Sequence, residues 1–186
     1  MATFTLAVHG GAGTILKSMM TPELEARYTA GLQEALDKGY QVMASGGTAL
    51  DAVEVAVRAL EDNELFNAGR GAVFTKKGIN EMDAAIMDGS NLAGGAVAGV
   101  RNIKNPVTLA KEIMLHSGHV MLSGNGAKEF ALNRGIEQAP DEYFFTKYRY
   151  DQWIDIRDSD FYQLDHKEDG LKGMAHEEKK FDTVDA

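Results

Sequence analysis

The sequence of 186 residues contains no cysteine, few prolines and no long apolar run, and its basic residues are outnumbered by acidic ones. Without cysteine, disulfides, thiol catalysis and thiolate metal sites are excluded for this chain. The formal net charge of −9 argues against nucleic acid or an anionic membrane surface as a partner. No stretch approaches the roughly 20 apolar residues that span a bilayer, and no leader pattern is present. These absences predict a cytoplasmic protein and leave small neutral or zwitterionic molecules open as ligands.

The composition that remains is that of an ordinary globular protein, with 44% hydrophobic and 25% charged residues. A chain of this length favours one domain with a substantial core. Residues 161–186 differ, because they are mostly charged or small and have no apolar periodicity. Such a segment cannot bury enough surface to offset the entropy lost on ordering. We therefore predict one folded unit over residues 1–160 and an acidic, disordered linker over residues 161–186.

Capping residues and apolar spacing predict the secondary structure. Thr21-Pro22 begins a helix in which apolar residues recur three and four apart until Gly46-Gly47. Thr48 begins a second helix that ends near residue 62, and Asn105-Pro106 begins a third. Short apolar runs bounded by glycine predict strands, of which the middle three form a meander. The expected strands are residues 3–8, 72–75, 81–87, 96–100 and 119–122, and the later helices are residues 105–116, 125–133 and 141–157.

The stretch HGGAG, residues 9–13, directly follows the first expected strand. Glycine is used where φ must be positive or where another group approaches the backbone closely, so this stretch is either a tight turn or a ligand-binding loop. It resembles the oxyanion-hole loop of lipases and esterases, but the chain has no G-x-S-x-G nucleophile elbow. The dinucleotide, phosphate and zinc patterns G-x-G-x-x-G, G-x-x-x-x-G-K and H-E-x-x-H are also absent.

Two further stretches are poorly explained by turn chemistry alone. Residues 60–71 form an irregular segment after a helix, and residues 83–99 contain strands of alanine and glycine that allow a neighbouring layer to approach. Close packing would account for both stretches without any function. Within the second, Asp83 is expected to be buried and to need partners, either as a structural carboxylate, which we favour, or as a support of catalysis, and we interpret Asp88 as a turn residue.

Six segments, taken together, resemble the plant-type (type III) L-asparaginase and isoaspartyl peptidase family of N-terminal nucleophile hydrolases. The resemblance runs in order from residue 5 to about residue 165. It implies an α+β fold, the four-layer αββα sandwich of that class, of which this chain is the α-subunit half. The segments are HGGAG (9–13), LFNAGRGAVFT (65–75), MDAAIMDG (82–89), GGAVAGV (94–100), NPV (105–107) and HVMLSGNGAKEFA (119–131).

The resemblance also implies an activity. A precursor cuts itself into α and β subunits, and the new N-terminal threonine of the β subunit is the nucleophile, with its own amine as base. It hydrolyses L-asparagine to L-aspartate and ammonia, and it hydrolyses β-aspartyl dipeptides. We expect this threonine on a β chain beyond Ala186. Thr183 is a less favoured candidate, because its neighbours Asp182 and Asp185 depart from the family pattern. Two competing hypotheses are a glycosylasparaginase-like amidase and an inactive relative that binds a small ligand.

The implied assembly is an (αβ)2 heterotetramer with its substrate-binding residues on the β subunit. In this chain, the resemblance implies that Asn67 supports the nucleophile and that Gly10 and Gly11 lie beside the cleavage site. No cofactor is implied for the chemistry. A structural sodium ion is implied, since a hard cation prefers oxygen ligands. Its ligands would be the backbone carbonyls of Leu60, Glu61, Asn63, Phe66, Ala68 and Arg70.

Overall fold

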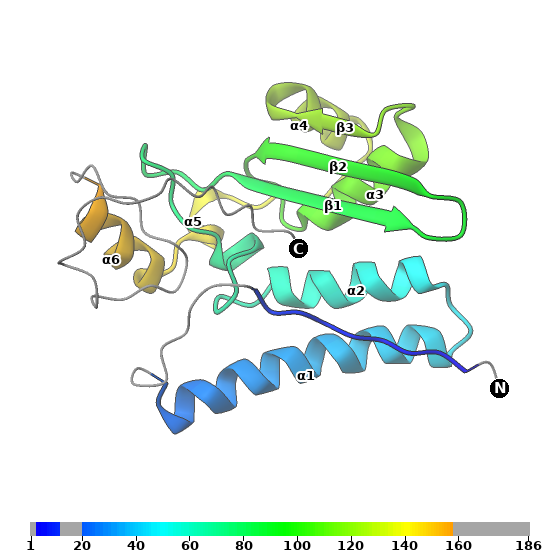
Figure 1. Ribbon diagram of the computed structural model, residues 1–186. Helices are drawn as coiled ribbons and strands as arrows, with labels where there is room; N and C mark the ends of the chain where they lie inside the picture. The colour runs from blue at the N-terminus through cyan, green and yellow to red at the C-terminus, as the bar shows by residue number, and fades with distance from the viewer. Residues whose placement is uncertain (1–2, 12–19, 158–186) are drawn as a thin grey trace, which may run out of the picture.

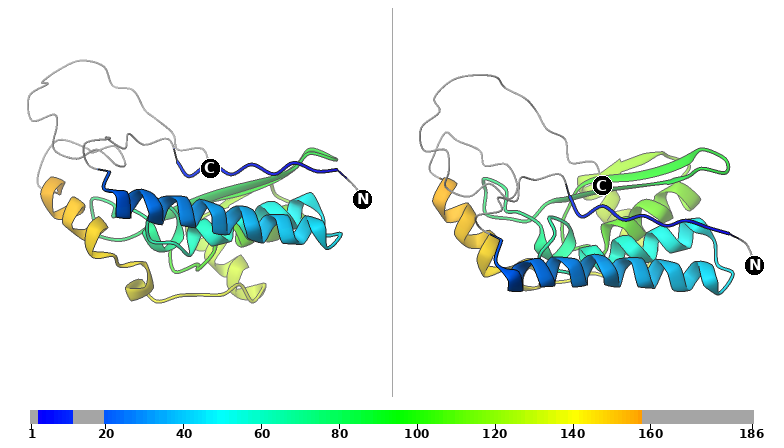
Figure 2. Two further views of the ribbon diagram at one scale, coloured as in Figure 1. Left: turned by 90° about the horizontal axis from the view of Figure 1, so that it is seen from below. Right: turned by 60° about the horizontal axis from the view of Figure 1, so that its bottom comes forward.

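Helices and a small sheet form two layers in the computed structural model, which describes residues 3–11 and 20–157. Figure 1 shows α1 and α2 side by side, with α3 against the sheet. In both views of Figure 2, the sheet and residues 3–11 lie on one side of α1 and α2. The elements are α1 (Pro22–Ala44), α2 (Ala49–Glu61), η2 (Gly69–Gly71), β1 (Met82–Asp88), β2 (Ala93–Val100), α3 (Pro106–His116), β3 (Met121–Ser123), α4 (Gly124–Asn133), α5 (Asp141–Phe144) and α6 (Lys147–Ile156).

The first two helices begin where the capping residues predict. The hydroxyl of Thr21 accepts a hydrogen bond from the Leu24 N–H at 3.2 Å, and the hydroxyl of Thr48 accepts one from the Asp51 N–H at 3.1 Å. Each bond satisfies an N–H that the helix itself leaves unpaired. The helix predictions for these two segments are confirmed within one or two residues at each end.

The sheet has the order β1-β2-β3, with β1 and β2 antiparallel and β2 and β3 parallel. The register shifts between Met82 and Ala84, where Gly99 on the facing strand has φ +61°. The Asp83 carboxylate accepts the Gly99 N–H at 2.7 Å. Its interpretation as a structural residue is confirmed, but the expected burial is wrong, because Asp83 is exposed. The Asp88 carboxylate accepts the Ser90 N–H at 2.9 Å, which confirms the turn.

Small residues in β2 let α3 approach the sheet closely. A Cβ atom added to Gly95 would lie 2.1 Å from the Ala110 carbonyl oxygen, so this strand position tolerates no side chain. The resulting core lies between the sheet and α3, and a second apolar cluster joins α1, α2 and Phe66. The expectation that residues 83–99 are small because a neighbouring layer packs against them is confirmed.

Two expected strands are wrong. Residues 3–8 are extended and alternate between exposed and half-buried side chains, as a strand does, yet they form no ladder with any described residue. Their inward side chains pack instead on α1, where Phe4 contacts Tyr40 and Leu6 contacts Gly39. Residues 72–75 form only an isolated bridge between Phe74 and Asn80. In both cases the local pattern is that of a strand, but a strand also needs a partner.

The single helix expected over residues 141–157 is also wrong, since the chain forms α5 and α6 there instead. Phe145 is extended, and the hydroxyl of Thr146 caps a new helix by accepting the Arg149 N–H at 3.3 Å. Threonine favours this N-cap role over a position inside a helix. The predicted linker, residues 161–186, and Thr183 lie outside the described residues.

Candidate functional site

The segment from the end of α2 through η2, which we call the site loop (residues 60–71), is held by short-range hydrogen bonds. The Asn63 N–H donates to the Leu60 carbonyl at 3.1 Å, and the Leu65 N–H donates to the Asn63 side-chain oxygen at 3.0 Å. The side-chain bond replaces a further helical turn, because Leu65 no longer donates to the carbonyl four residues before it. The loop therefore leaves the helix axis directly after Glu61.

Phe66 anchors the site loop and brings it to the HGGAG segment. Its ring is 3% exposed and packs edge-on against Tyr28, with the ring centroids 5.8 Å apart. A Cβ atom added to Gly10 would lie 2.9 Å from the Phe66 ring and 3.0 Å from Leu32, while Gly11 has φ +124°. Both glycines are thus required by geometry. The structure brings Gly10 and the site loop together, as candidate residues of one site should be.

Asn67 lies half-buried at the centre of the site loop. Its side-chain oxygen accepts the Val73 N–H at 3.0 Å. The Val73 carbonyl in turn accepts the side-chain amide of Asn80 at 3.2 Å, and the same amide donates to the Ala72 carbonyl at 2.8 Å. With its oxygen engaged, Asn67 has its amide nitrogen left to donate to a ligand.

Backbone carbonyls crowd around the two glycines of η2. A Cβ atom added to Gly69 would lie 2.3 Å from the Glu61 carbonyl oxygen, and one added to Gly71 would lie 2.1 Å from that of Phe66 and 2.6 Å from that of Glu64. The Asn63, Phe66 and Ala68 carbonyls each accept one backbone N–H from a described residue, which leaves a lone pair on each of these oxygens. Oxygen donors in a tight loop fit a hard cation such as sodium. No group of three acidic or histidine side chains is placed to hold a metal ion in the part of the chain that the structure describes.

The Glu61 side chain caps α3, a helix that follows much later in the chain. It is 3% exposed, and its Oε1 accepts the Val107 N–H of α3 at 2.9 Å, whereas Oε2 has no hydrogen-bond partner among the described residues. Burial raises the pKa of Glu61 from 4.5 to about 8, although the hydrogen bond from Val107 acts in the opposite direction. The carboxyl group is therefore protonated near neutral pH.

The raised pKa of Glu61 predicts a pH-dependent stability. The folded state holds the Glu61 proton more tightly than the unfolded chain does, so protonation of this carboxyl favours folding. This contribution to the free energy of unfolding is fully present below pH 4.5 and is lost as the pH rises through about 8. In the variant Glu61→Gln this pH dependence of the free energy of unfolding should disappear. The stability of the variant relative to the parent should therefore increase as the pH rises. Denaturant unfolding between pH 5 and pH 9 measures both curves. Parallel curves for parent and variant would show that Glu61 does not titrate in this range.

Asp62 connects the site loop to α3 and α5. Its Oδ1 accepts the Asn105 side-chain amide at 3.1 Å and the Tyr143 hydroxyl at 3.0 Å. Burial and the neighbouring Asp62 carboxylate raise the pKa of Tyr143 to about 12, so the hydroxyl stays a donor. On the other side, the Arg149 guanidinium of α6 donates to the Gly71 carbonyl at 2.8 Å. Both ends of the site loop are therefore fixed by residues that follow much later in the sequence.

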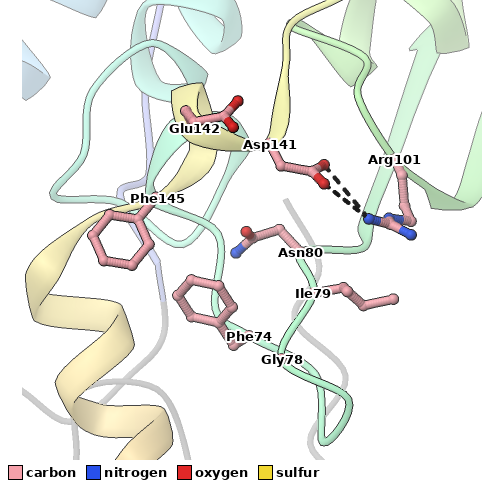
Figure 3. Close-up of a pocket in the computed structure, with 8 residues that line it drawn as sticks. All are labelled: Phe74, Gly78, Ile79, Asn80, Arg101, Asp141, Glu142 and Phe145. Carbon is pink, nitrogen blue, oxygen red and sulfur yellow. Dashed lines mark hydrogen bonds and ion pairs between the residues drawn. The ribbon is translucent and has the colours of Figure 1, made fainter.

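A pocket of about 330 Å³ opens beside the segment that follows the site loop. Figure 3 shows two phenylalanine rings on one side of Asn80 and the pair of Arg101 and Asp141 on the other, with the Arg101 guanidinium 3.3 Å from the Asp141 carboxylate. The pocket combines apolar walls with groups of both charges, as small-ligand sites do. It is lined by Phe74, Gly78, Ile79, Asn80, Arg101, Asp141, Glu142 and Phe145.

Three side chains of this region carry no mark in the sequence that points to the site. The family resemblance implies a role for Glu61 only through its carbonyl, and it indicates neither Tyr143 nor Arg149 as a support of the site loop. Their partners lie 46, 81 and 78 residues away, respectively. No local pattern marks such a contact. The one signal in the sequence is an arginine among the aromatic residues of the segment 143–153.

The comparisons with known proteins agree on one family. A sequence profile of the asparaginase family matches residues 2–186. The chain is 43% identical over 186 residues to the isoaspartyl peptidase of Escherichia coli strain K12, covering 100% of this chain and 57% of that protein. It is 48% identical over 149 residues to the isoaspartyl peptidase/L-asparaginase of Xenopus laevis, covering 80% and 47%. It is 46% identical over 152 residues to the plant-type L-asparaginase of Thermococcus kodakarensis, covering 82% and 47%. The chain spans about half the length of these relatives.

Proposed function

Because the chain belongs to the asparaginase family, we propose that it is the α part of an amidohydrolase that acts on L-asparagine and on β-aspartyl dipeptides. The names of the relatives support both substrates, since the Xenopus laevis relative is named isoaspartyl peptidase/L-asparaginase, and the other two are named isoaspartyl peptidase and plant-type L-asparaginase, respectively. The observation that carries the proposal is the meeting of Gly10 with the site loop that holds Asn67. The HGGAG segment or the site loop alone could be explained by close packing without any function.

The proposed nucleophile is the N-terminal threonine of a β subunit, produced when a precursor cuts itself. Its α-amine takes the proton from the threonine hydroxyl, whose oxygen attacks the side-chain amide or isopeptide carbonyl of the substrate. The amine or ammonia leaves, and water then hydrolyses the ester to release L-aspartate. Thr183 remains a less favoured candidate for the nucleophile.

Asn67 is the proposed supporting residue of this chain. The hydrogen bond from Val73 fixes its oxygen, so its amide nitrogen is oriented to donate toward the reacting threonine or the substrate oxygen. Gly10 allows the chain to pass beside Phe66 without a side-chain clash, and Gly11 adopts a positive φ of +124°. In the proposal, their conformational freedom serves the strained backbone at the cleavage site.

The surfaces left uncovered support a partner subunit. The sheet face opposite α3 is built from small side chains such as Ala85, Ala96 and Ala98, and it ends in Met87, which is 59% exposed. Residues 3–11 have the alternation of a strand but no paired edge in the described chain. Unpaired strand edges and a flat apolar face favour association with further strands. We propose that a β subunit covers both, within an (αβ)2 heterotetramer that carries its substrate-gripping residues on the β subunit.

No helix among residues 20–157 is both long and apolar enough to cross a membrane. A cytoplasmic location stays a prediction.

A structural sodium ion within the site loop is part of the proposal. The carbonyls of Leu60, Glu61, Asn63, Phe66, Ala68 and Arg70 would bind it, and the glycines of η2 let the backbone of this loop pack closely together. The ion would have no role in bond breaking. It would hold the site loop, and with it Asn67, in a single conformation.

Sodium should therefore stabilise the protein. An ion that binds only the folded state adds about 2.7 kcal/mol at a concentration 100 times its Kd. Replacing sodium chloride by choline chloride at constant ionic strength should lower the melting temperature of the complete protein. In Gly69→Ala, whose added methyl group would occupy the position 2.3 Å from the Glu61 carbonyl oxygen, the sodium dependence should be lost. Equal melting temperatures of the parent in both salts would contradict a bound sodium ion.

The proposed activity is tested by release of L-aspartate. The complete protein that carries this chain is incubated with L-asparagine, with a β-aspartyl dipeptide and with the matched α-aspartyl dipeptide. We expect aspartate from the first two substrates and none from the third, because attack requires the side-chain carbonyl. Binding of aspartate without any release would favour the inactive small-ligand binder, and preference for a glycosylated asparagine would favour the glycosylasparaginase-like amidase.

A further inference from the structure

We infer that Arg149 is a positioning residue, which from α6 fixes the Gly71 carbonyl and thereby holds Asn67 in the geometry that the reaction needs. The inference rests on the proposed function, since it names the residue that orders the proposed site from outside it. Figure 1 shows α6 as a peripheral helix, far along the chain from the site loop. The Arg149 side chain connects α6 to that loop by a hydrogen bond to the Gly71 carbonyl.

Arg149 is the buried residue of α6, with 1% of its surface exposed. Its Nε donates to the Gly71 carbonyl at 2.8 Å, and its Nη1 donates to the Gln152 side-chain oxygen at 3.1 Å. The guanidinium also lies over the Tyr148 ring, 5.4 Å from its centroid. The planar group is thus held on three sides, so its orientation toward Gly71 is defined.

Gly71 is the point at which such a contact controls the site loop. Its carbonyl is bound by Arg149, its N–H donates to Ala68 at 3.0 Å, and its Cα lies too close to the Phe66 carbonyl for a side chain. Two residues later, Val73 donates its N–H to the Asn67 side chain. A shift of Gly71 therefore moves Val73, and with it the oxygen that orients the Asn67 amide.

Packing alone does not require an arginine at this position. Burying a guanidinium carries a large desolvation cost, and an apolar side chain of similar length would fill the same volume at lower cost. What an apolar side chain lacks is a donor directed at the Gly71 carbonyl. The function of Arg149 is therefore to place that carbonyl.

The test compares three variants of the complete protein. Arg149→Met keeps the length and removes the donors. Arg149→Lys keeps a donor for Gly71 but cannot reach Gln152 at the same time with a fixed plane. Lys147→Ala, on an exposed part of the same helix, removes the contact with Asp151 and is the control. For each variant we measure kcat and KM per mature active site with a β-aspartyl dipeptide, the melting temperature, and amide hydrogen exchange of the segment 66–75.

We expect Arg149→Met to lose about 100-fold in kcat, because a displacement of about 1 Å in a positioned group has that effect, with KM changed less than about threefold. Arg149→Lys should lie between this variant and the parent. Exchange in the segment 66–75 should be at least about tenfold faster in Arg149→Met, while the segment 22–44 is unchanged. Lys147→Ala should match the parent throughout.

A role in stability alone predicts a lower melting temperature with full kcat in the molecules that remain folded, and this result would overturn the inference. So would parent-like exchange in the segment 66–75 of Arg149→Met. If that variant does not fold, Arg149→Lys carries the test, and parent-like kcat and exchange in it overturn the inference. If the parent itself releases no aspartate, the proposed function fails, while the exchange measurement still decides whether Arg149 holds the site loop.

Discussion

Replacing Asn67 by alanine is expected to lower kcat for a β-aspartyl dipeptide about 10²- to 10³-fold, the effect of removing one donor that stabilises a developing oxyanion. We propose two separate tasks for this side chain. Its oxygen accepts the Val73 N–H at 3.0 Å, and its nitrogen remains to donate to the reacting groups. Alanine removes both contacts. Steady-state kinetics on the mature protein measure the loss, and KM should change far less than kcat.

Two further variants separate these tasks. Asn67→Asp keeps the oxygen that accepts from Val73 but removes the amide donor, so it should lose kcat almost as fully as alanine while keeping the site loop ordered. Asn91→Ala is the matched control, because Asn91 also accepts a backbone N–H, that of Ala93 at 2.8 Å, but lies in the turn between β1 and β2. Asn91→Ala should keep the parent kcat. Full activity in Asn67→Asp would show that Asn67 acts only through Val73.

Replacing Gly71 by alanine is expected to destabilise the protein by roughly 3 kcal/mol, because a forced overlap belongs to the severe class of single substitutions. The added Cβ would lie 2.1 Å from the Phe66 carbonyl oxygen and 2.6 Å from that of Glu64. Both obstacles are backbone, which cannot rotate away as a flexible side chain can. The site loop must open, and the contacts of Phe66 with α1 are then strained. Denaturant unfolding of the complete protein measures the effect.

Gly89→Ala is the control for this substitution. Gly89 lies in the turn after β1, and a Cβ atom added there meets nothing within 4 Å. Its effect should stay within about 0.5 kcal/mol, as for an exposed position without special geometry. If Gly71→Ala were as mild as Gly89→Ala, the site loop would have room that the structure does not give it, and the carbonyls around η2 would not form a fixed cation site.

The elements that the sequence predicted well are those specified by neighbouring residues. The helices α1 and α2 follow from Thr21 and Thr48, whose hydroxyls cap the first turn, and from apolar spacing that needs no partner to be recognised. The turn at Asp88 is equally local. The α+β class and the four-layer arrangement were both implied by the family resemblance; the mixture of helices and a small sheet is confirmed, and the four-layer arrangement stays a prediction.

The strand errors have a non-local cause. Residues 3–8 carry the alternation of a strand, but whether they join a ladder depends on what lies beside them, and the described chain offers no partner. Phe74 forms one bridge with Asn80 and no more. The break between α5 and α6 escapes prediction for another reason: the aromatic spacing continues across it, while Thr146 caps a new helix inside the same stretch.

The residues of the candidate site likewise fall into those that a local sequence motif marks and those that only distant contacts reveal. Asn67 and Gly10 could be selected because they stand in short, recognisable segments, and the structure brings those segments together at Phe66. The carboxyl of Glu61 and the guanidinium of Arg149 could not be selected, because their partners Val107 and Gly71 are distant in sequence. Their importance is visible only once burial and hydrogen bonds are known.

The measurement that tests the central claim most directly is the intact mass and N-terminal sequence of every polypeptide in the purified, active protein. The account predicts two chains, the second of which begins with threonine, and it predicts that blocking this amine abolishes aspartate release. A single uncut polypeptide that hydrolyses a β-aspartyl dipeptide at the full rate would contradict the proposal that this chain is the α part of a self-processing hydrolase.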